Sequence, residues 1–248
     1  MSAIAGIRKA LSGAFDALGY TIERKRSPAW GDDPYLDQQR LLGASDVRVV
    51  ADVGANVGDT VRQYRTIFPG ATIHAFEPFP EVYRQLVARF AADPAVRPHQ
   101  AAVTDASGTR SLHVNPVHVT NSLLPLHPAH AELARAGVPP GPDTTIDVPA
   151  ITLDEFCAAE GLPGIDVLKM DIQGGEGMAL EGAAGLLARK AIRVIYLEVA
   201  FAPLYEGQWD FCDVTQILDR HGYRVFGLYN LVHEDRGLAW GDAIFRPS

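Results

Sequence analysis

The sequence is short of several features that define whole classes of protein. It contains two cysteines in 248 residues, Cys157 and Cys212, and these lie far apart in the chain. Such spacing fits neither a disulfide framework nor a Cys-x-x-Cys metal site, so we expect two free thiols. No stretch approaches the roughly 18 consecutive apolar residues of a membrane span, and Arg8 and Lys9 interrupt the apolar core that an N-terminal signal needs. We therefore predict a cytoplasmic protein with no integral membrane segment.

Positive charge is also scarce. Lysine and arginine total 22 against 30 aspartate and glutamate residues, which gives a formal net charge of -8 and a pI near 5.4. A surface that neutralises many phosphates needs clustered basic side chains, so we expect no nucleic-acid partner. The composition leaves the oligomeric state open, a homo-oligomer included.

The first 46 residues are predicted to form a segment separate from the main domain. Apolar residues recur there at spacings of three and four, which predicts one helix: Ile4, Ile7, Leu11, Phe15 and Leu18. This helix either docks on the body or binds a membrane surface or a partner. The turn-rich stretch SPAWGDDP then leads into the main domain. We thus divide the chain into a helix and loop extension, 1–46, and one domain, 47–248.

From residue 47 onward, short apolar runs alternate with helical patterns. This alternation is typical of a mostly parallel α/β sheet with helices on both faces. The predicted strands span residues 47–53, 71–76, 98–103, 165–170 and 192–199. The predicted helices between them span residues 58–67, 80–91 and 177–188.

The remaining segments carry weaker local signals. Thr152 and Glu155 form a capping box, which predicts a helix beginning near Leu153. Alternating polar and β-branched residues at 109–115 and 144–150 predict an antiparallel pair beside the sheet. The C-terminal part predicts a helix near 212–221 and a closing hairpin built from YRVFGLY and DAIF.

The run VVADVGANVGDT ends a predicted strand in a glycine turn. Such a turn points backbone N–H groups into the crevice at the carboxyl end of a parallel sheet, so residues 52–60 should line a ligand site. The dinucleotide fingerprint GxGxxG is absent because Asn56 stands at its second glycine, and no Gly-Lys-Ser/Thr of a P-loop follows. Asp52 and Asp59 oppose a phosphate and suit an ammonium group.

The strand predicted at 71–76 runs directly into Glu77 and Pro78. An acidic residue at this place can accept hydrogen bonds from both hydroxyls of a ribose. The alternative for Glu77 is an exposed loop carboxylate. A ligand with a ribose, a cationic amino-acid end and no phosphate is S-adenosylmethionine, which we predict as the cofactor.

An ordered series of motifs resembles the FkbM family of S-adenosylmethionine-dependent methyltransferases. It comprises DVGANVGDT, FEPFP, NSL, TLDEF, DVLKMDIQGGE, LEGA, YLEV and GDAIF. The resemblance covers residues 47–245 and implies a class I, Rossmann-like methyltransferase fold, a seven-stranded sheet with one antiparallel strand. It also implies O-methylation of a small-molecule or glycan hydroxyl, on a carbohydrate or secondary metabolite. One departure is the glycine pair 175 and 177 around Glu176, where the family usually has a bulkier residue on at least one side.

The candidate cofactor contacts come from the glycine turn and the next two strand ends. They are Asp52, Gly54, Ala55, Asn56, Gly58, Asp59, Thr60, Glu77, Pro78, Ala102 and Val103. The resemblance adds Asn121 and Ser122 as candidate substrate contacts. Lys169 is a third, because it shares a strand face with Asp171; a structural role is its alternative.

Methyl transfer from a sulfonium requires an acceptor oxygen held in line and the removal of its proton. Asp171 ends the fourth predicted strand and Glu198 lies near the end of the fifth, so both carboxylates should open onto the crevice. Asp171 is the first candidate for the base, with orientation of the cofactor ammonium or helix capping as alternatives. Glu198 is the second, and His118 the third, as a neutral imidazole. We expect no obligatory metal.

Two questions stay open at this point. An NAD-dependent oxidoreductase on a similar sheet, or a non-catalytic adenosyl-binding module, would share many of these features. Tyr205, Trp209 and Tyr229 form either an aromatic wall for the acceptor or part of the core.

Overall fold

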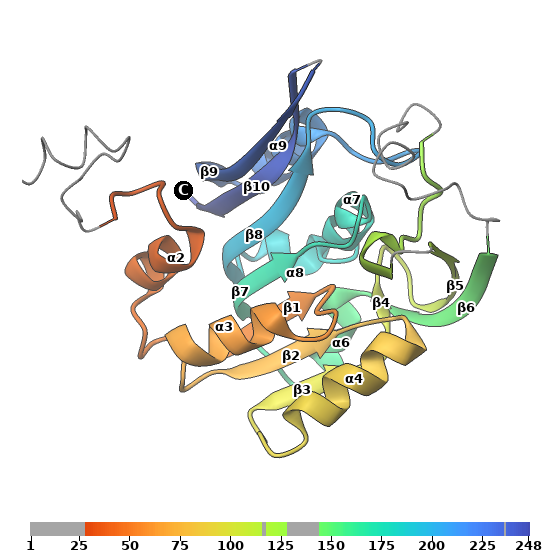
Figure 1. Ribbon diagram of the computed structural model, residues 1–248. Helices are drawn as coiled ribbons and strands as arrows, with labels where there is room; N and C mark the ends of the chain where they lie inside the picture. Colours follow the sequence, from red (N-terminus) through yellow and green to blue (C-terminus); the bar gives the residue numbers. More distant parts are fainter. Residues whose placement is uncertain (1–27, 116–117, 128–143, 236) are drawn as a thin grey trace, which may run out of the picture. The chain divides into compact units, whose positions relative to one another are not determined.

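The computed structural model describes residues 28–115, 118–127, 144–235 and 237–248 (Figure 1). The chain divides into two compact units, Met1–Asp33 and Pro34–Ser248. The described part of the first unit is a turn in which the Ala29 N–H donates to the Asp32 carboxylate at 2.6 Å. The helix predicted between Ile4 and Leu18 lies outside the described residues.

Seven strands form the main sheet of the second unit, in the order β3-β2-β1-β7-β8-β10-β9. Their bounds are β1 (Val49–Val53), β2 (Thr72–Phe76), β3 (Val96–His99), β7 (Ile165–Met170), β8 (Ile192–Ala200), β9 (Tyr223–Glu234) and β10 (Gly237–Pro247). The strands from β3 to β8 pair in parallel, and β10 is antiparallel to both of its neighbours. The expected mostly parallel sheet with one antiparallel strand is therefore confirmed. Strand order reverses between β1 and β7, and such a switch point opens a crevice at the carboxyl ends of the strands.

Helices cover both faces of this sheet, as the alternating apolar pattern predicted (Figure 1). One buried cluster joins the sheet to α2 (Pro34–Leu42), α3 (Asp59–Ile67) and α4 (Pro80–Phe90). The other joins it to α6 (Leu153–Ala159), α7 (Glu176–Glu181), α8 (Ala184–Ala188) and α9 (Phe211–Arg220). Adjacent strand residues alternate between the clusters: Val50 belongs to the first and Ala51 to the second. Within the described residues, no helix has the length and apolarity needed to cross a bilayer.

A three-stranded sheet of order β4-β6-β5 lies beside the main one. It consists of β4 (Ala102–Val103), β5 (Gly108–Val114) and β6 (Thr144–Ile151), and a short 3-10 helix, η1 (His118–Thr120), follows β5. The predicted antiparallel pair is thus confirmed as β5 and β6. The single strand predicted at 98–103 is wrong: β3 ends at His99, and β4 leaves the main sheet to pair with β6.

The helix predicted at 177–188 is also interrupted, because the chain ends α7 at Glu181 and restarts as α8 at Ala184. Gly182 lies at the break. A Cβ there would come within 2.1 Å of the Thr104 carbonyl oxygen, so β4 and this turn approach each other closely. Helical periodicity alone does not reveal such a contact.

Helix α2 belongs to the second compact unit, Pro34–Ser248, although the sequence-based boundary at 46 placed it in the extension. Its Asp37 is fully buried and accepts a hydrogen bond from the Tyr229 hydroxyl at 2.9 Å. Its Gln38 accepts one from Tyr64 at 3.1 Å. Tyr35 packs edge-on against both Tyr64 and Tyr196. Tyr229 is therefore a core residue and forms no acceptor wall.

Candidate active site

Two adjoining hollows lie over the carboxyl ends of the central strands. The larger has a volume of about 540 Å³ and extends from the β1 turn to Glu198 on β8. The smaller, of about 70 Å³, lies toward β2 and the three-stranded sheet. Gly54, Asn56 and Asp171 line both, so a single elongated ligand can reach from one hollow into the other.

The turn after β1 requires its first glycine. Gly54 has φ +78°, and a Cβ there would lie 2.0 Å from the carbonyl oxygen of Asp171 at the end of β7. The two strand ends therefore touch through their backbones. Asn56, two residues on, also has positive φ (48°), which asparagine tolerates better than most residues.

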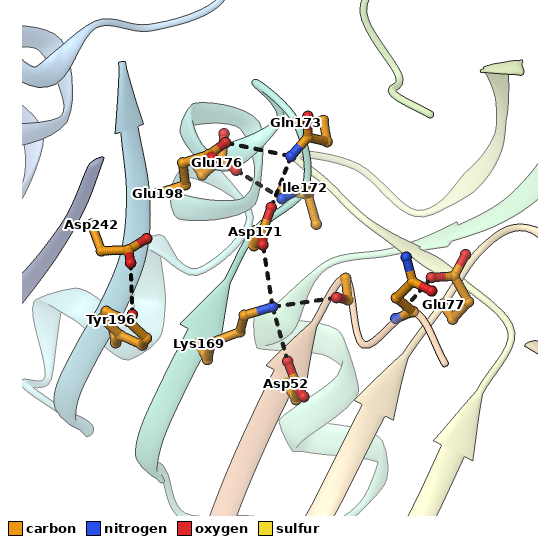
Figure 2. Close-up of polar contacts among 12 residues, drawn as sticks. Asp52, Glu77, Lys169, Asp171, Ile172, Gln173, Glu176, Tyr196, Glu198 and Asp242 are labelled. Atoms are coloured by element: carbon orange, nitrogen blue, oxygen red, sulfur yellow. Dashed lines mark hydrogen bonds and ion pairs between the residues drawn. The ribbon is translucent and has the colours of Figure 1, made fainter. Parts of the chain in front are cut away.

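Glu77 ties this turn to the end of β2. One carboxylate oxygen accepts the N–H of Phe79 at 2.8 Å. The other accepts the N–H of Asn56 at 3.1 Å, in the turn after β1 (Figure 2). Burial raises the pKa of Glu77, and these two N–H groups oppose that rise. Glu77 is thus no exposed loop carboxylate: it lines the smaller hollow in a fixed orientation.

A buried ion pair lies beneath the larger cavity. Asp52 of β1 and Lys169 of β7 are register partners, and the Lys169 ammonium lies 3.3 Å from the Asp52 carboxylate. The same ammonium donates to the Gly54 carbonyl at 3.3 Å and lies 3.9 Å from Asp171 (Figure 2). Burial lowers the pKa of Lys169, but Asp52 and Asp171 more than offset this and leave it raised. These contacts favour the structural role for Lys169, although part of it lines the cavity.

The two candidate carboxylates are joined by one amide. Gln173 donates from Nε2 to Asp171 at 2.9 Å and to Glu198 at 3.5 Å (Figure 2). The Asp171 side chain is 47% exposed. Glu198 is largely buried, and burial first, then the negative charges of Asp171, Glu176 and Asp242, raise its pKa well above the usual value.

The second of the two glycines around Glu176, Gly177, has a packing reason. A Cβ on Gly177 would lie 2.4 Å from the Trp209 ring, so the indole fills the space that a bulkier residue would take. Trp209 packs with the second core cluster and lines neither hollow. Glu176 is buried, accepts the Ile172 N–H at 2.8 Å, and has its pKa raised to about 7, mainly by burial. It stabilises the turn that carries Gln173.

Most residues predicted for the site line the hollows. The larger cavity is lined by Gly54, Ala55, Asn56, Asp59, Thr60, Lys169, Asp171, Glu198 and His118. The smaller is lined by Gly54, Asn56, Glu77, Pro78, Ala102, Val103, Asn121, Ser122, His118 and Asp171. Asp52 and Gly58 line neither; Asp52 lies below the floor, and Gly58 packs where a Cβ would meet Phe90 at 2.3 Å.

Several lining residues were not found from the sequence. In the larger cavity the most informative are Trp240 and Gln173, which join Tyr205 on its wall. Trp240 reaches it because antiparallel pairing places Trp240 opposite Ala200 of β8, a register that no local pattern encodes. Gln173 could have been found from its position, two residues after a strand-terminal Asp171.

The smaller hollow fits an adenosyl group by its chemistry. Apolar side chains of Phe76, Ala102 and Leu112 line it, and Glu77 supplies a carboxylate. The Nδ2 of Asn121 is buried there and has no hydrogen-bond partner among the described residues. A buried donor without a partner is costly, and an acceptor atom of a bound ligand would satisfy it.

Comparison with known proteins identifies a family. Residues 52–225 match the family model described as the methyltransferase FkbM domain. The 2-O-methyltransferase NoeI of Sinorhizobium fredii (strain NBRC 101917 / NGR234) is 27% identical over 68% of this chain and 70% of its own. The 31-O-demethyl-FK506 methyltransferase FkbM of Streptomyces tacrolimicus is 29% identical over 71% of this chain and 73% of its own.

Solved structures resemble the chain more distantly. The precorrin-6y C5,15-methyltransferase from Geobacter metallireducens GS-15 is 14% identical, with a TM-score of 0.43 over 86% of both chains. A TM-score below 0.5 adds nothing to the assignment.

Proposed function

Because this chain belongs to the FkbM methyltransferase family and is an S-adenosylmethionine-dependent O-methyltransferase, we propose that its acceptor is a hydroxyl of a carbohydrate or secondary metabolite. The observation that carries this proposal is the pair of carboxylates, Asp171 and Glu198, in a cavity that adjoins the smaller hollow, whose lining suits an adenosyl group. An oxygen acceptor must lose its proton, and a carboxylate at the acceptor supplies the base. Names of two relatives specify oxygen positions, 2-O and 31-O, which supports the same acceptor atom.

The cofactor would span both hollows. Glu77 would accept the ribose hydroxyls, and Asn121 would donate to an acceptor atom of adenine. Asp59, at the end of the turn after β1, lines the larger cavity and would attract the cationic amino-acid end. When bound, the sulfonium supplies an electrophilic methyl group; Asp171 and Glu198 face the same cavity as that group.

Replacing Glu77 with alanine tests the adenosyl placement. We expect S-adenosylhomocysteine affinity, measured by calorimetry, to weaken by about 1 to 3 kcal/mol because charge-assisted ribose contacts are lost. Glu81→Ala is the matched control, since Glu81 is exposed on the first turn of α4. Unchanged affinity in Glu77→Ala would remove Glu77 from the binding site.

Glu198 is the carboxylate that we assign as the base. Asp171 lies half-exposed near the Lys169 ammonium, which compensates its charge. Glu198 is more buried, and burial together with the charges of Asp171, Glu176 and Asp242 raises its pKa well above that of an ordinary glutamate. A carboxylate with a raised pKa takes a hydroxyl proton more effectively than an ordinary one.

The charge of the larger cavity restricts the acceptor. Among its described lining residues, Asp59, Asp171 and Glu198 are acidic, and the basic side chains are Lys169 and His118. Lys169 already contacts Asp52 and the Gly54 carbonyl. Asp59 already pairs with the guanidinium groups of Arg89 and Arg62, at 2.8 and 3.5 Å, so the remaining negative charge comes from Asp171 and Glu198. A phosphate or carboxylate near the reacting hydroxyl would therefore meet these two carboxylates, and the described lining offers it no guanidinium or second ammonium. The proposed acceptor carries no negative charge there.

A panel of acceptors tests this directly. The protein is incubated with methyl-labelled S-adenosylmethionine and matched neutral glycosides, uronates and sugar phosphates, and with neutral polyketide alcohols. We expect label on an ether oxygen of a neutral acceptor, located by mass spectrometry, and at least about tenfold lower kcat/KM for the acidic counterpart. A preference for the acidic member would refute the charge argument, and label on nitrogen alone would refute the acceptor atom.

Other expectations stay predictions. The described residues contain no group of three or more His, Cys, Asp or Glu side chains arranged to hold a metal ion. Metal independence, a cytoplasmic location and the lack of a nucleic-acid partner await chelation, fractionation and binding measurements, and the oligomeric state awaits light scattering.

A further inference from the structure

Gln173 adopts a backbone conformation that the surrounding residues must hold in place. It lies in the turn between β7 and α7 with φ +56°, in the left-handed region that non-glycine residues rarely occupy. The Ser122 hydroxyl donates to its carbonyl oxygen at 2.6 Å. A strained backbone that a neighbouring segment stabilises is a feature that clusters at functional sites.

The side chain of Gln173 is fixed at both ends of its amide. Its Oε1 accepts the Tyr205 hydroxyl at 2.8 Å. This contact orients the two N–H groups of Nε2 toward the carboxylates, 2.9 Å from Asp171 and 3.5 Å from Glu198 (Figure 2). A neutral amide thus separates two like charges and donates to both.

We propose that Gln173 is a positioning residue for methyl transfer, which holds Glu198 and Asp171 at the orientation and spacing that the acceptor hydroxyl requires. The proposal rests on the function given above, in which Glu198 takes the acceptor proton. Tyr205 aims the amide, and Ser122 fixes the turn that carries it. Gln173 lines both hollows, and its side-chain amide acts through the two carboxylates to which it donates.

The charges around Glu198 determine how the loss of Gln173 would act. Asp171 after β7, Glu176 of α7 and Asp242 of β10 disfavour its ionised form, and Lys169 favours it. The Tyr205 hydroxyl also faces this cluster. Gln173 is the hydrogen-bond donor to Glu198 among the described residues. Removing that donor favours protonated Glu198 further, so the pH at which it becomes a base moves upward.

Two substitutions and one control test the proposal. Gln173→Leu removes the donor at similar volume, and Tyr205→Phe leaves Gln173 in place but releases its orientation. Gln216→Leu is the control, because Gln216 is exposed on α9 and bonds to Arg220. Measurements are kcat against pH with a neutral acceptor, S-adenosylhomocysteine affinity by calorimetry, and a ¹³C NMR titration of glutamate carboxyls with Glu198 assigned from Glu198→Gln.

For Gln173→Leu we expect kcat at pH 7 to fall about tenfold. The midpoint of the acidic limb of the kcat–pH profile should shift upward by about 0.5 to 1 pH unit, and S-adenosylhomocysteine affinity should stay within about twofold. Tyr205→Phe should change kcat and the midpoint of the acidic limb in the same directions but by less, and Gln216→Leu should match the wild type. An unmoved limb and an unmoved Glu198 titration in a folded variant would overturn the positioning role. Equal losses of kcat and cofactor affinity would overturn it too, because they indicate a cofactor contact. The NMR titration needs no acceptor, so a wild type that methylates no hydroxyl would refute the proposed function separately.

Discussion

Replacing Glu198 with glutamine is expected to lower kcat by about 10²- to 10⁴-fold, because the acceptor hydroxyl loses its general base. Affinity for S-adenosylhomocysteine should stay within about twofold, since Glu198 lines the larger cavity and not the smaller hollow, where the adenosyl group is proposed to bind. The variant should fold at least as stably as the wild type, because a charge buried among other carboxylates is removed.

The pH dependence of the wild type follows from the same group. Burial and the neighbouring carboxylates raise the pKa of Glu198 above that of an ordinary glutamate. The base form of Glu198 is the deprotonated one, so kcat should rise with pH through this raised pKa. On acidification, the loss of activity should therefore begin at a higher pH than for an exposed glutamate. The residual activity of Glu198→Gln should lack this rise of kcat with pH.

Asp171→Asn separates the two carboxylates. We expect a smaller loss of kcat, about tenfold or less, because Asp171 pairs with Lys169 and shares Gln173 with the base. If Asp171→Asn proves the more damaging of the two, the base is Asp171, as the sequence first suggested. Proportional losses in kcat and cofactor affinity would instead identify Asp171 as a partner of the cofactor ammonium.

The second large effect concerns stability. Lys169→Met should lower the free energy of unfolding by about 3 to 5 kcal/mol, because it leaves the fully buried Asp52 carboxylate without its ion-pair partner. Urea unfolding followed by circular dichroism measures it. Lys190→Met is the control: Lys190 is exposed, and a change within about 0.5 kcal/mol is expected.

A double variant and a pH series sharpen this test. Asp52→Asn combined with Lys169→Met removes both charges and should recover most of the lost stability. Burial already raises the pKa of Asp52 against the opposing effect of Lys169, and loss of Lys169 raises it further. The folded variant then binds a proton that the unfolded chain releases, so its free energy of unfolding should fall as pH rises above about 4. A single variant that is as stable as the wild type at neutral pH would show that the pair contributes nothing.

The central strands were predictable because buried parallel strands have continuous apolar sequences. Residues 47–53, 165–170 and 192–199 were expected as strands, and β1, β7 and β8 fall there. The edge was not predictable: β4 lies within the range expected for one strand but pairs with β6, which lies some forty residues further on. Helix α2 was missed as part of the domain because its buried Asp37 finds its partner, Tyr229, at the far end of the chain.

The site follows the same division. Gly54, Glu77 and Asp171 could be placed because each ends a strand, and the carboxyl ends of parallel strands meet at one edge of a sheet. Three other features depend on which strands and helices become neighbours. These are the pairing of Lys169 with Asp52, the packing of Trp209 against Gly177, and the position of Trp240 in the cavity lining.

Local order in the chain therefore determines the fold class, the glycine turn after β1 and the family, since these depend on residues close together in sequence. The choice between Asp171 and Glu198 as base, the bridging amide of Gln173 and the charge of the acceptor cavity come from packing. Proton affinity depends on burial and on charges a few ångströms away, and those distances exist only once β7, β8 and β10 lie side by side.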